Sequence, residues 1–239
     1  MVVTTPAIVF SSVKYSEADL IVTCYTRTSG IKSYLLRGIL KSKKGKLKTS
    51  YFQPLTQLEL EAVHKDKGTL ERIRETKVVH PYSTLHTQVV KGGVVMFLAE
   101  MLKNCIKEEA PNPPLYDYLE GSFLWLDSHD KIANFHLLFL LKLTAFLGIY
   151  PDTSNMEGEW FNLQEGYFTS QMDGNYCETG DSVNILKGLF GIDFDALETV
   201  NIDRKKRSEV LNLLLAYYQL HLQGYKKPRS LPVLNELFN

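Results

Sequence analysis

The sequence predicts an α+β protein of two domains, a β-barrel at residues 1–80 and a helical domain at residues 81–239. Residues 6–79 contain short runs rich in β-branched and aromatic residues, separated by glycine or charged turns, which is typical of strands. Further along the chain, apolar residues recur at helical spacing. The charge changes at the same place. Residues 1–80 carry 14 Lys and Arg against 7 Asp and Glu, whereas residues 81–239 carry 13 against 20.

Five runs are expected to form strands, and they are AIVFSSV, LIVTCYT, SYLLRGIL, TQLELEAVH and LERIRETKVV. Turns are expected at Gly30, Gly45 and Gly68, which fall between these runs. Five strands in so short a segment favour a five-stranded, partly open Greek-key barrel, the OB architecture, whose exposed face often binds single strands. An SH3-like barrel fits the number of strands nearly as well.

The rest of the chain is expected to be mainly helical. In the segment WFNLQEGYFTS, which lies within a loop-rich insert at about residues 150–181, the glycine and polar residues predict a short hairpin. Gly148 and Pro151 end the helix before this insert. Helices are expected at residues 84–107, with Thr84 as N-cap, and at 114–126, 131–147 and 203–223.

Patterns that would indicate an enzyme are absent from the sequence. The glycines of GILKSKKGK are seven residues apart rather than five, and Leu47 replaces the hydroxyl residue of a phosphate-binding loop. None of the six histidines has a partner at the one-turn spacing of a helical metal site. Asp193 and Asp195 are interpreted as helix-capping residues. We therefore expect no catalytic residues, although an enzyme with a scattered site could use these two aspartates and His221.

The three cysteines, Cys24, Cys105 and Cys177, lie far apart and form no CxxC pair. They indicate neither a disulfide framework nor a cysteine zinc site. The N-terminus has no signal-peptide pattern, and Lys142 interrupts the longest apolar run. We therefore expect a soluble cytoplasmic protein that has no cofactor, no metal and no membrane attachment.

The stretch RGILKSKKGKLKTS, residues 37–50, contains six cations and no acid. Alone, it reads as an ordinary lysine-rich hairpin loop. The same barrel also carries further cations and the aromatic residues Tyr15, Tyr25 and Phe52. Cations that follow phosphates, together with rings on which bases stack, favour binding of single-stranded nucleic acid. The residues expected to bind DNA are Lys14, Arg27, Lys32, Tyr34, Arg37, Lys41, Lys43, Lys44, Lys46, Lys48 and Tyr51.

The chain resembles the bacterial DNA repair and recombination mediator family RecO. The segment AIVFSSVKYSEADLIVTCYTRTSGIKSYLLRGILKSK is similar to the family's opening strand, its turns and its basic third strand, and YFQPLTQLELE is similar to its fourth strand. FHLLFLLKLTAFLGIYPD looks like the family helix that leads into a zinc-binding insert. The order and spacing of these loose motifs extend over nearly all of the chain.

This resemblance implies an OB domain that binds single- and double-stranded DNA, and ATP-independent annealing of complementary strands. It also implies partnership with RecR in loading RecA, and binding to the tail of single-strand binding protein, all at the nucleoid in the cytoplasm. In one respect the sequence departs from the family. Many members carry four cysteines in the insert, whereas here only Cys177 is present. We expect no zinc, and an insert held by packing of Trp160, Phe161, Tyr167 and Phe168.

The acidic tail of single-strand binding protein is expected to contact one of two basic clusters in the helical domain. The first cluster is Arg204, Lys205, Lys206 and Arg207, and the second is Lys226, Lys227 and Arg229. Cations at the start of a helix oppose its dipole, so the first cluster has no local structural reason. The alternative function is a protein adaptor whose basic barrel binds an acidic partner.

Overall fold

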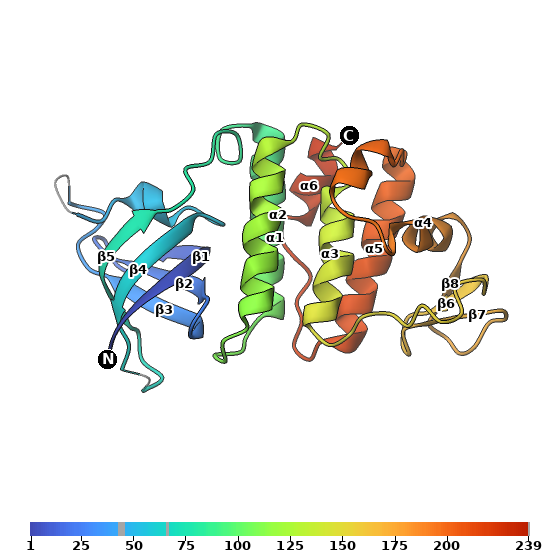
Figure 1. The fold of residues 1–239 in the computed structure, drawn as a ribbon, viewed down its shortest axis with the longest axis horizontal. Helices are drawn as coiled ribbons and strands as arrows, with labels where there is room; N and C mark the ends of the chain where they lie inside the picture. Colours follow the sequence, from blue (N-terminus) through green and yellow to red (C-terminus); the bar gives the residue numbers. More distant parts are fainter. Residues whose placement is uncertain (43–45, 66, 239) are drawn as a thin grey trace. The chain divides into compact units, whose positions relative to one another are not determined.

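The structure is a computed structural model that describes residues 1–42, 46–65 and 67–238 (Figure 1). The chain divides into two compact units, Met1–Ser128 and His129–Asn239. Within the described residues, the first holds a five-stranded antiparallel sheet and two α-helices, and the second holds four α-helices and a three-stranded sheet. This confirms the α+β class expected from the sequence. In the parts of the chain that the structure describes, no helix is both long and apolar enough to cross a membrane.

The five expected strands all form, in the order β3-β2-β1-β4-β5 along the sheet. The long strand β1 pairs with β4 up to Ile8 and with β2 from Ala7 onward. A bulge between Val9 and Ser11 bends this strand, which lets one strand serve two sides of a curled sheet. The strands are β1 (Val2–Lys14), β2 (Leu20–Thr26), β3 (Gly30–Leu36), β4 (Gln57–Val63) and β5 (Arg72–Val78).

The sheet closes into a barrel where its two outer strands, β3 and β5, meet. Tyr34 forms a parallel bridge with Glu71. The N–H of Glu71 donates to the Ser33 carbonyl at 2.8 Å, and the N–H of Leu35 donates to the Glu71 carbonyl at 3.0 Å. This closed five-stranded arrangement is of the OB type. The side chains that fill the barrel include Val9, Val22, Leu36, Leu58, Leu60 and Ile73.

Two helices, α1 (Val89–Cys105) and α2 (Pro113–Ser128), belong to the same unit as the barrel. The ring of Tyr25 stacks on Phe10 in the barrel and on Tyr116 of α2, with centroid distances of 5.7 and 6.4 Å. Gly30 adopts a positive φ of 59°, and a Cβ atom there would lie 2.6 Å from the backbone of Glu109. The β2–β3 turn therefore requires glycine both for its conformation and for its close packing against the α1–α2 connection.

The last turn of α2 fixes the segment between β5 and α1. The carboxylate of Asp127 accepts hydrogen bonds from the backbone N–H groups of residues 83–85, at 2.7–2.9 Å. The buried ammonium of Lys91 donates to the Thr84 hydroxyl at 2.7 Å and to the Asp127 carbonyl at 2.8 Å. Because Thr84 is committed to these contacts, it is not an N-cap, and α1 begins at Val89 rather than at residue 84.

The second unit is built around the helix α3 (Phe135–Phe146), which is buried on nearly all sides. The expected hairpin is present as β6 (Trp160–Asn162) and β7 (Tyr167–Thr169), with β8 (Cys177–Thr179) added to its edge. The Asp193 carboxylate accepts the N–H of Ala196 at 3.0 Å beside a short 3-10 helix (Asp195–Thr199), whose first residue is Asp195. The remaining helices are α4 (Asp181–Leu189), α5 (Arg204–His221) and α6 (Leu231–Leu237).

Replacing Asp127 by Ala should lower the free energy of unfolding by about 1–3 kcal/mol at pH 7, because three backbone donors would lose a charged acceptor. Partial burial by itself would raise the pKa of Asp127, but the N–H donors at Ser83, Thr84 and Leu85 hold it below its usual range. This stabilisation is present above the ordinary aspartate pKa and is lost as the pH falls through the folded-state value. Denaturant unfolding at pH 7 and pH 3 measures it. Asp130→Ala, which removes an exposed acid, is the control. An equal loss of stability in the two variants would contradict the role assigned to the Asp127 carboxylate.

Candidate nucleic-acid interface

A groove with a volume of about 590 Å³ opens beside the seam between β3 and β5. Its apolar floor includes Leu36, Ile39 and Ile73. Among the described residues that line it, only Glu71 is acidic, and this side chain is buried. We call this feature the basic groove, because exposed cations surround it. These cations are Arg37, Lys46, Lys65, Arg72 and Arg74.

A polar network beneath the basic groove holds its walls in place. The buried carboxylate of Glu71 accepts the backbone N–H of Lys65 through both oxygens, at 2.9 and 3.0 Å. The hydroxyl of Tyr34 lies 2.9 Å from Nε2 of His64. Both contacts tie the β4–β5 connection to the closed seam. They therefore fix the position of Lys65 relative to the arginines of β5.

Sequence reasoning missed Lys65, Arg72 and Arg74 as groove residues. A signal was available in LERIRET, where the exposed Arg72 and Arg74 alternate with the buried Glu71 and Ile73. Residues two apart on a strand share one face, so this pattern places both arginines on the outer side of β5. Arg74 also lies 3.6 Å from the Glu61 carboxylate, in an exposed ion pair.

A hydrogen bond joins the segment after β3 to the β1–β2 turn, which contains the acids Glu17 and Asp19. The backbone N–H of Gly38 donates to the Asp19 carboxylate at 2.7 Å, and this bond holds the pKa of Asp19 below its usual range. The segment after β3 is thereby packed against the turn that carries Lys14 and Tyr15. Tyr15 is 64% exposed, and the neighbouring Lys14 is exposed as well.

Several of the expected loop cations are exposed and only weakly engaged. Lys41 pairs with Glu17 at 3.2 Å and Lys46 with Glu75 at 2.6 Å, all through exposed side chains. Such surface ion pairs contribute little, roughly 0–1 kcal/mol, so a phosphate could replace the carboxylate. Lys48 lies 5.9 Å from the ring of the half-buried Tyr51. Two further candidates, Lys43 and Lys44, lie outside the described residues.

Three of the residues expected to bind DNA have structural contacts. Tyr34 is fully buried, and a ring without an exposed face offers no surface on which a base can stack. The side chain of Lys32 is only 9% exposed and pairs with Glu109 at 3.1 Å. Arg27 makes a two-pronged contact with Asp117 of α2, at 2.9 and 3.1 Å. The expectation for Tyr34 and Lys32 is therefore corrected, because Tyr34 fills the barrel core and Lys32 joins the barrel to the α1–α2 connection. The Arg27 side chain is 42% exposed in its pair with Asp117, so its expected role in DNA binding stays a prediction. Tyr25 and Phe52 are buried as well.

In the second unit, two members of the first basic cluster make structural contacts and the other two are exposed. Lys206 pairs with Asp181 at 2.9 Å, and the guanidinium of Arg207 donates to the Asn134 side chain and to the Ile202 carbonyl. Arg204 and Lys205 are exposed, and Lys205 lies 3.9 Å from the Glu209 carboxylate. In the second cluster Lys226, Lys227 and Arg229 are all exposed.

The insert is packed through aromatic side chains, as the sequence suggested. Phe161 contacts Phe168 and Tyr217, with ring centroids 4.8 and 5.6 Å apart. The ammonium of Lys187 lies over the Phe168 ring at 5.4 Å and donates to the Gly158 carbonyl. Within the described ranges, no group of three or more His, Cys, Asp and Glu side chains gathers in a way that could hold a metal ion.

The closed barrel is of the OB type, exposed cations surround its groove, and a helical unit follows it in the chain. Comparison with known proteins identifies the family. Residues 1–82 match the family model "Recombination protein O N terminal", and residues 86–231 match "Recombination protein O C terminal".

Whole-length relatives agree with these matches. The chain is 51% identical to DNA repair protein RecO of Christiangramia forsetii and 46% identical to that of Flavobacterium psychrophilum, with 100% of both chains covered in each case. It is 36% identical to the RecO protein of Bacteroides fragilis over 98% of each chain. The chain therefore belongs to the RecO family of DNA repair and recombination proteins, which are mediators and not enzymes.

Removing two cations from the basic groove with Arg37→Ala/Arg72→Ala should weaken single-strand binding for all sequences, because phosphate contacts carry little sequence information. The plot of log K against log salt should become shallower by about 1.4, since each contact contributes about 0.7 for single strands. Fluorescence anisotropy with a labelled oligonucleotide measures both quantities. Lys77→Ala/Lys103→Ala removes two exposed cations outside the groove, and an equal loss in this control would contradict the assignment.

We expect purified protein to contain well below one zinc per chain, because Cys177 alone cannot complete a site of four ligands. Its thiol donates to the Asp173 carbonyl at 2.9 Å, as in an ordinary turn. Elemental analysis and thermal unfolding with and without chelator check this. Stoichiometric zinc, with unfolding at a lower temperature after chelation, would show that other side chains have replaced the cysteines.

Proposed function

We propose that this protein is a recombination mediator that binds single- and double-stranded DNA through the basic groove and anneals complementary strands without ATP. The observation that supports this most directly is the set of five exposed cations around an apolar floor on an OB barrel. Cations reduce the repulsion between two phosphate backbones, and an apolar floor tolerates any base. Neither contribution requires nucleotide hydrolysis.

The proposal extends to partners. With RecR, the protein would help to load RecA onto DNA coated by single-strand binding protein, working at the nucleoid in the cytoplasm. The helical unit would hold the acidic tail of single-strand binding protein through one of its two basic clusters. Charge-assisted hydrogen bonds from Arg or Lys to carboxylates suit such a motif.

An adaptor role remains a second candidate, because the basic groove could equally attract an acidic protein segment. The two functions differ in what the groove must do. An adaptor requires affinity for carboxylates and need not bring two DNA strands together. An annealing assay therefore distinguishes the mediator from the adaptor better than a binding assay does.

Annealing of complementary oligonucleotides, naked or coated with single-strand binding protein, should distinguish the two surfaces. We expect Arg37→Ala/Arg72→Ala to slow both reactions. Charge reversal in the tail-binding cluster, as Arg204→Glu/Lys205→Glu or as Lys226→Glu/Lys227→Glu, should slow only the reaction with coated strands by about tenfold or more. Fluorescence quenching between labelled strands measures the rate. Unchanged annealing of naked strands by the groove variant would favour the adaptor.

A further inference from the structure

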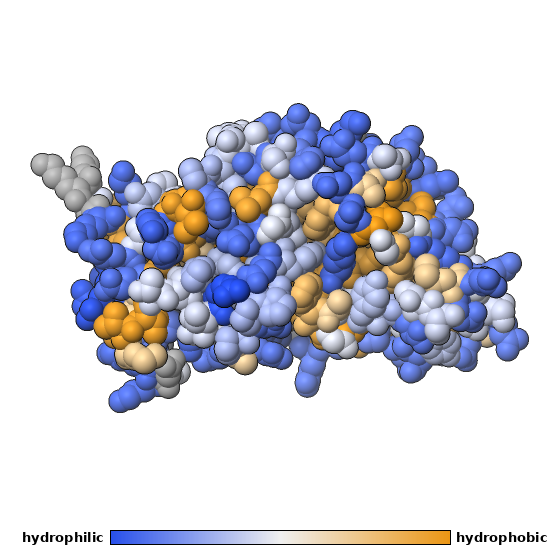
Figure 2. Space-filling model, viewed as in Figure 1, coloured by the Kyte–Doolittle hydropathy of each residue, from blue (hydrophilic) through white to orange (hydrophobic). Residues whose placement is uncertain are grey.

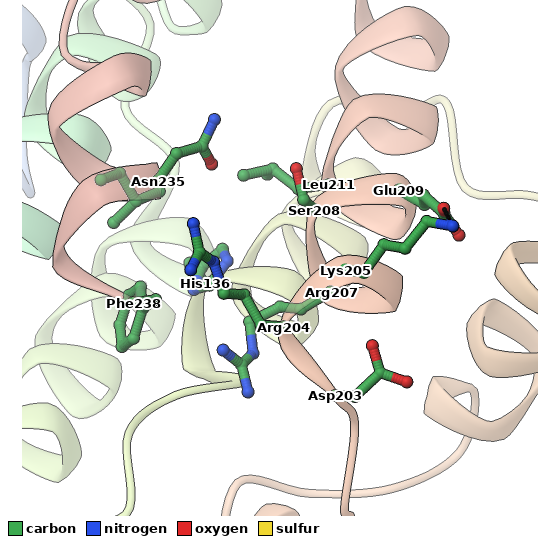
Figure 3. A pocket seen from close by; sticks show the side chains of 11 residues that line it. His136, Asp203, Arg204, Lys205, Arg207, Ser208, Glu209, Leu211, Asn235 and Phe238 are labelled. Atoms are coloured by element: carbon green, nitrogen blue, oxygen red, sulfur yellow. Dashed lines mark ion pairs between the residues drawn. The ribbon is translucent and has the colours of Figure 1, made fainter.

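The second unit contains a pocket of about 700 Å³ between the first turns of α5 and the short helix α6 (Figure 3). The first turns of α5 supply the cations Arg204, Lys205 and Arg207. The acids Asp203 and Glu209 also line the pocket, and Glu209 lies 3.9 Å from Lys205. Among the described residues, Arg204 forms no ion pair with a carboxylate. The apolar lining includes Leu211 and Leu234. The pocket thus combines positive charge with an apolar wall, which are the two features that an acidic, apolar peptide requires.

The chain itself fills the aromatic part of this pocket. The ring of Phe238 stacks on His136, with centroids 5.4 Å apart and an interplanar angle of 23°. The guanidinium of Arg207 lies 5.6 Å from the same ring. Figure 3 shows Asn235 and Phe238 on one side, the α5 residues on the other and His136 between them. Burial, with a smaller effect from the Arg207 charge, lowers the pKa of His136 to about 3, so its neutral ring is a suitable stacking partner.

The resident segment is largely apolar, with one acid close to its phenylalanine. Its sequence, LNELFN, contains an acid two residues before a phenylalanine. Residues 232–238 lie beyond residues 86–231, the region that the family model covers. With seven residues, α6 is too short to be stable as an isolated helix. Its position therefore depends on the packing of Leu231, Leu234 and Phe238, and loss of these contacts would release it.

We infer that this pocket is one binding site for which two segments compete, the chain's own α6 with Phe238 and an acidic peptide that ends in phenylalanine. The peptide ring would take the place of Phe238 between His136 and Arg207, and its carboxylates would contact Arg204 and Lys205. This rests on the proposed binding of the tail of single-strand binding protein, and it selects the first basic cluster as the receptor. The apparent affinity for the peptide is then the intrinsic affinity of the empty pocket multiplied by the fraction of molecules in which Phe238 is out of the pocket.

The test uses a fluorescein-labelled peptide of several aspartates that ends in a free phenylalanine, titrated with the whole chain. Phe238→Ala should bind this peptide about tenfold more tightly than the unaltered protein, because its competitor has lost the ring. Phe238→Trp retains the ring and should bind no more tightly than the unaltered protein. Val233→Ala, at an exposed position on the same helix, is the matched control and should leave affinity unchanged. Thermal unfolding establishes that each variant is folded.

The outcomes separate the inference from the function on which it rests. If the peptide binds the unaltered protein and Phe238→Ala with equal affinity, or binds the variant more weakly, Phe238 is a wall of the site and competition is excluded. If Arg204→Glu/Lys205→Glu binds as well as the unaltered protein, the receptor lies elsewhere. If no folded variant binds the peptide, tail recognition by this unit fails, and the inference fails with it.

Discussion

The hydrogen bonds that join β3 to β5 are the constraint on which the rest of the first unit depends. They close a sheet that would otherwise present two open edges. The closure also brings the end of β3 beside the start of β5, so that cations distant in sequence surround one groove. Glu71 contributes both to the closure and to the groove. Its backbone forms the seam, and its buried carboxylate accepts a hydrogen bond from the N–H of Lys65. The shape of the basic groove is therefore set by the barrel.

The cations of the barrel divide into two groups according to what surrounds them. Lys32 is nearly buried and Arg27 makes a two-pronged bond, so both hold the α1–α2 region to the barrel. Loss of the Lys32 pair is costly, because a nearly buried charge would be left uncompensated, whereas the side chains of Arg27 and Asp117 are 42% and 54% exposed. Lys46 and Lys41 pair with carboxylates in open solvent, where exchange costs little. Figure 2 shows hydrophilic side chains over much of the visible barrel surface, with smaller hydrophobic patches between them.

The sequence was sufficient for features that depend on local patterns and insufficient for those that depend on distant contacts. All five predicted strands formed, although β1 begins at Val2 rather than at residue 7 and β3 covers Gly30–Leu36 rather than residues 33–40. The start of α1 was placed too early because Thr84 is engaged by Asp127, which lies 43 residues away. Tyr34 was expected to be exposed, but the strand register turns it into the barrel. Lys65 and Arg72 became neighbours of Arg37 only through closure of the barrel, which no local pattern reveals.

A mediator must hold DNA that another protein already covers, and this requires two contacts of moderate strength. DNA binding through exposed cations is salt-sensitive and exchanges quickly. A tail receptor adds a second attachment, and the two attachments together bind more tightly than either alone because each raises the effective concentration of the other. A tail site of maximal affinity would oppose the release of single-strand binding protein. In the proposed competition, occupancy of the pocket by Phe238 would lower the affinity of the pocket for the tail and would leave the cations that contact its carboxylates in place. Tail capture would then be favoured only where DNA binding raises the local concentration, so the protein would act on coated DNA in preference to free single-strand binding protein.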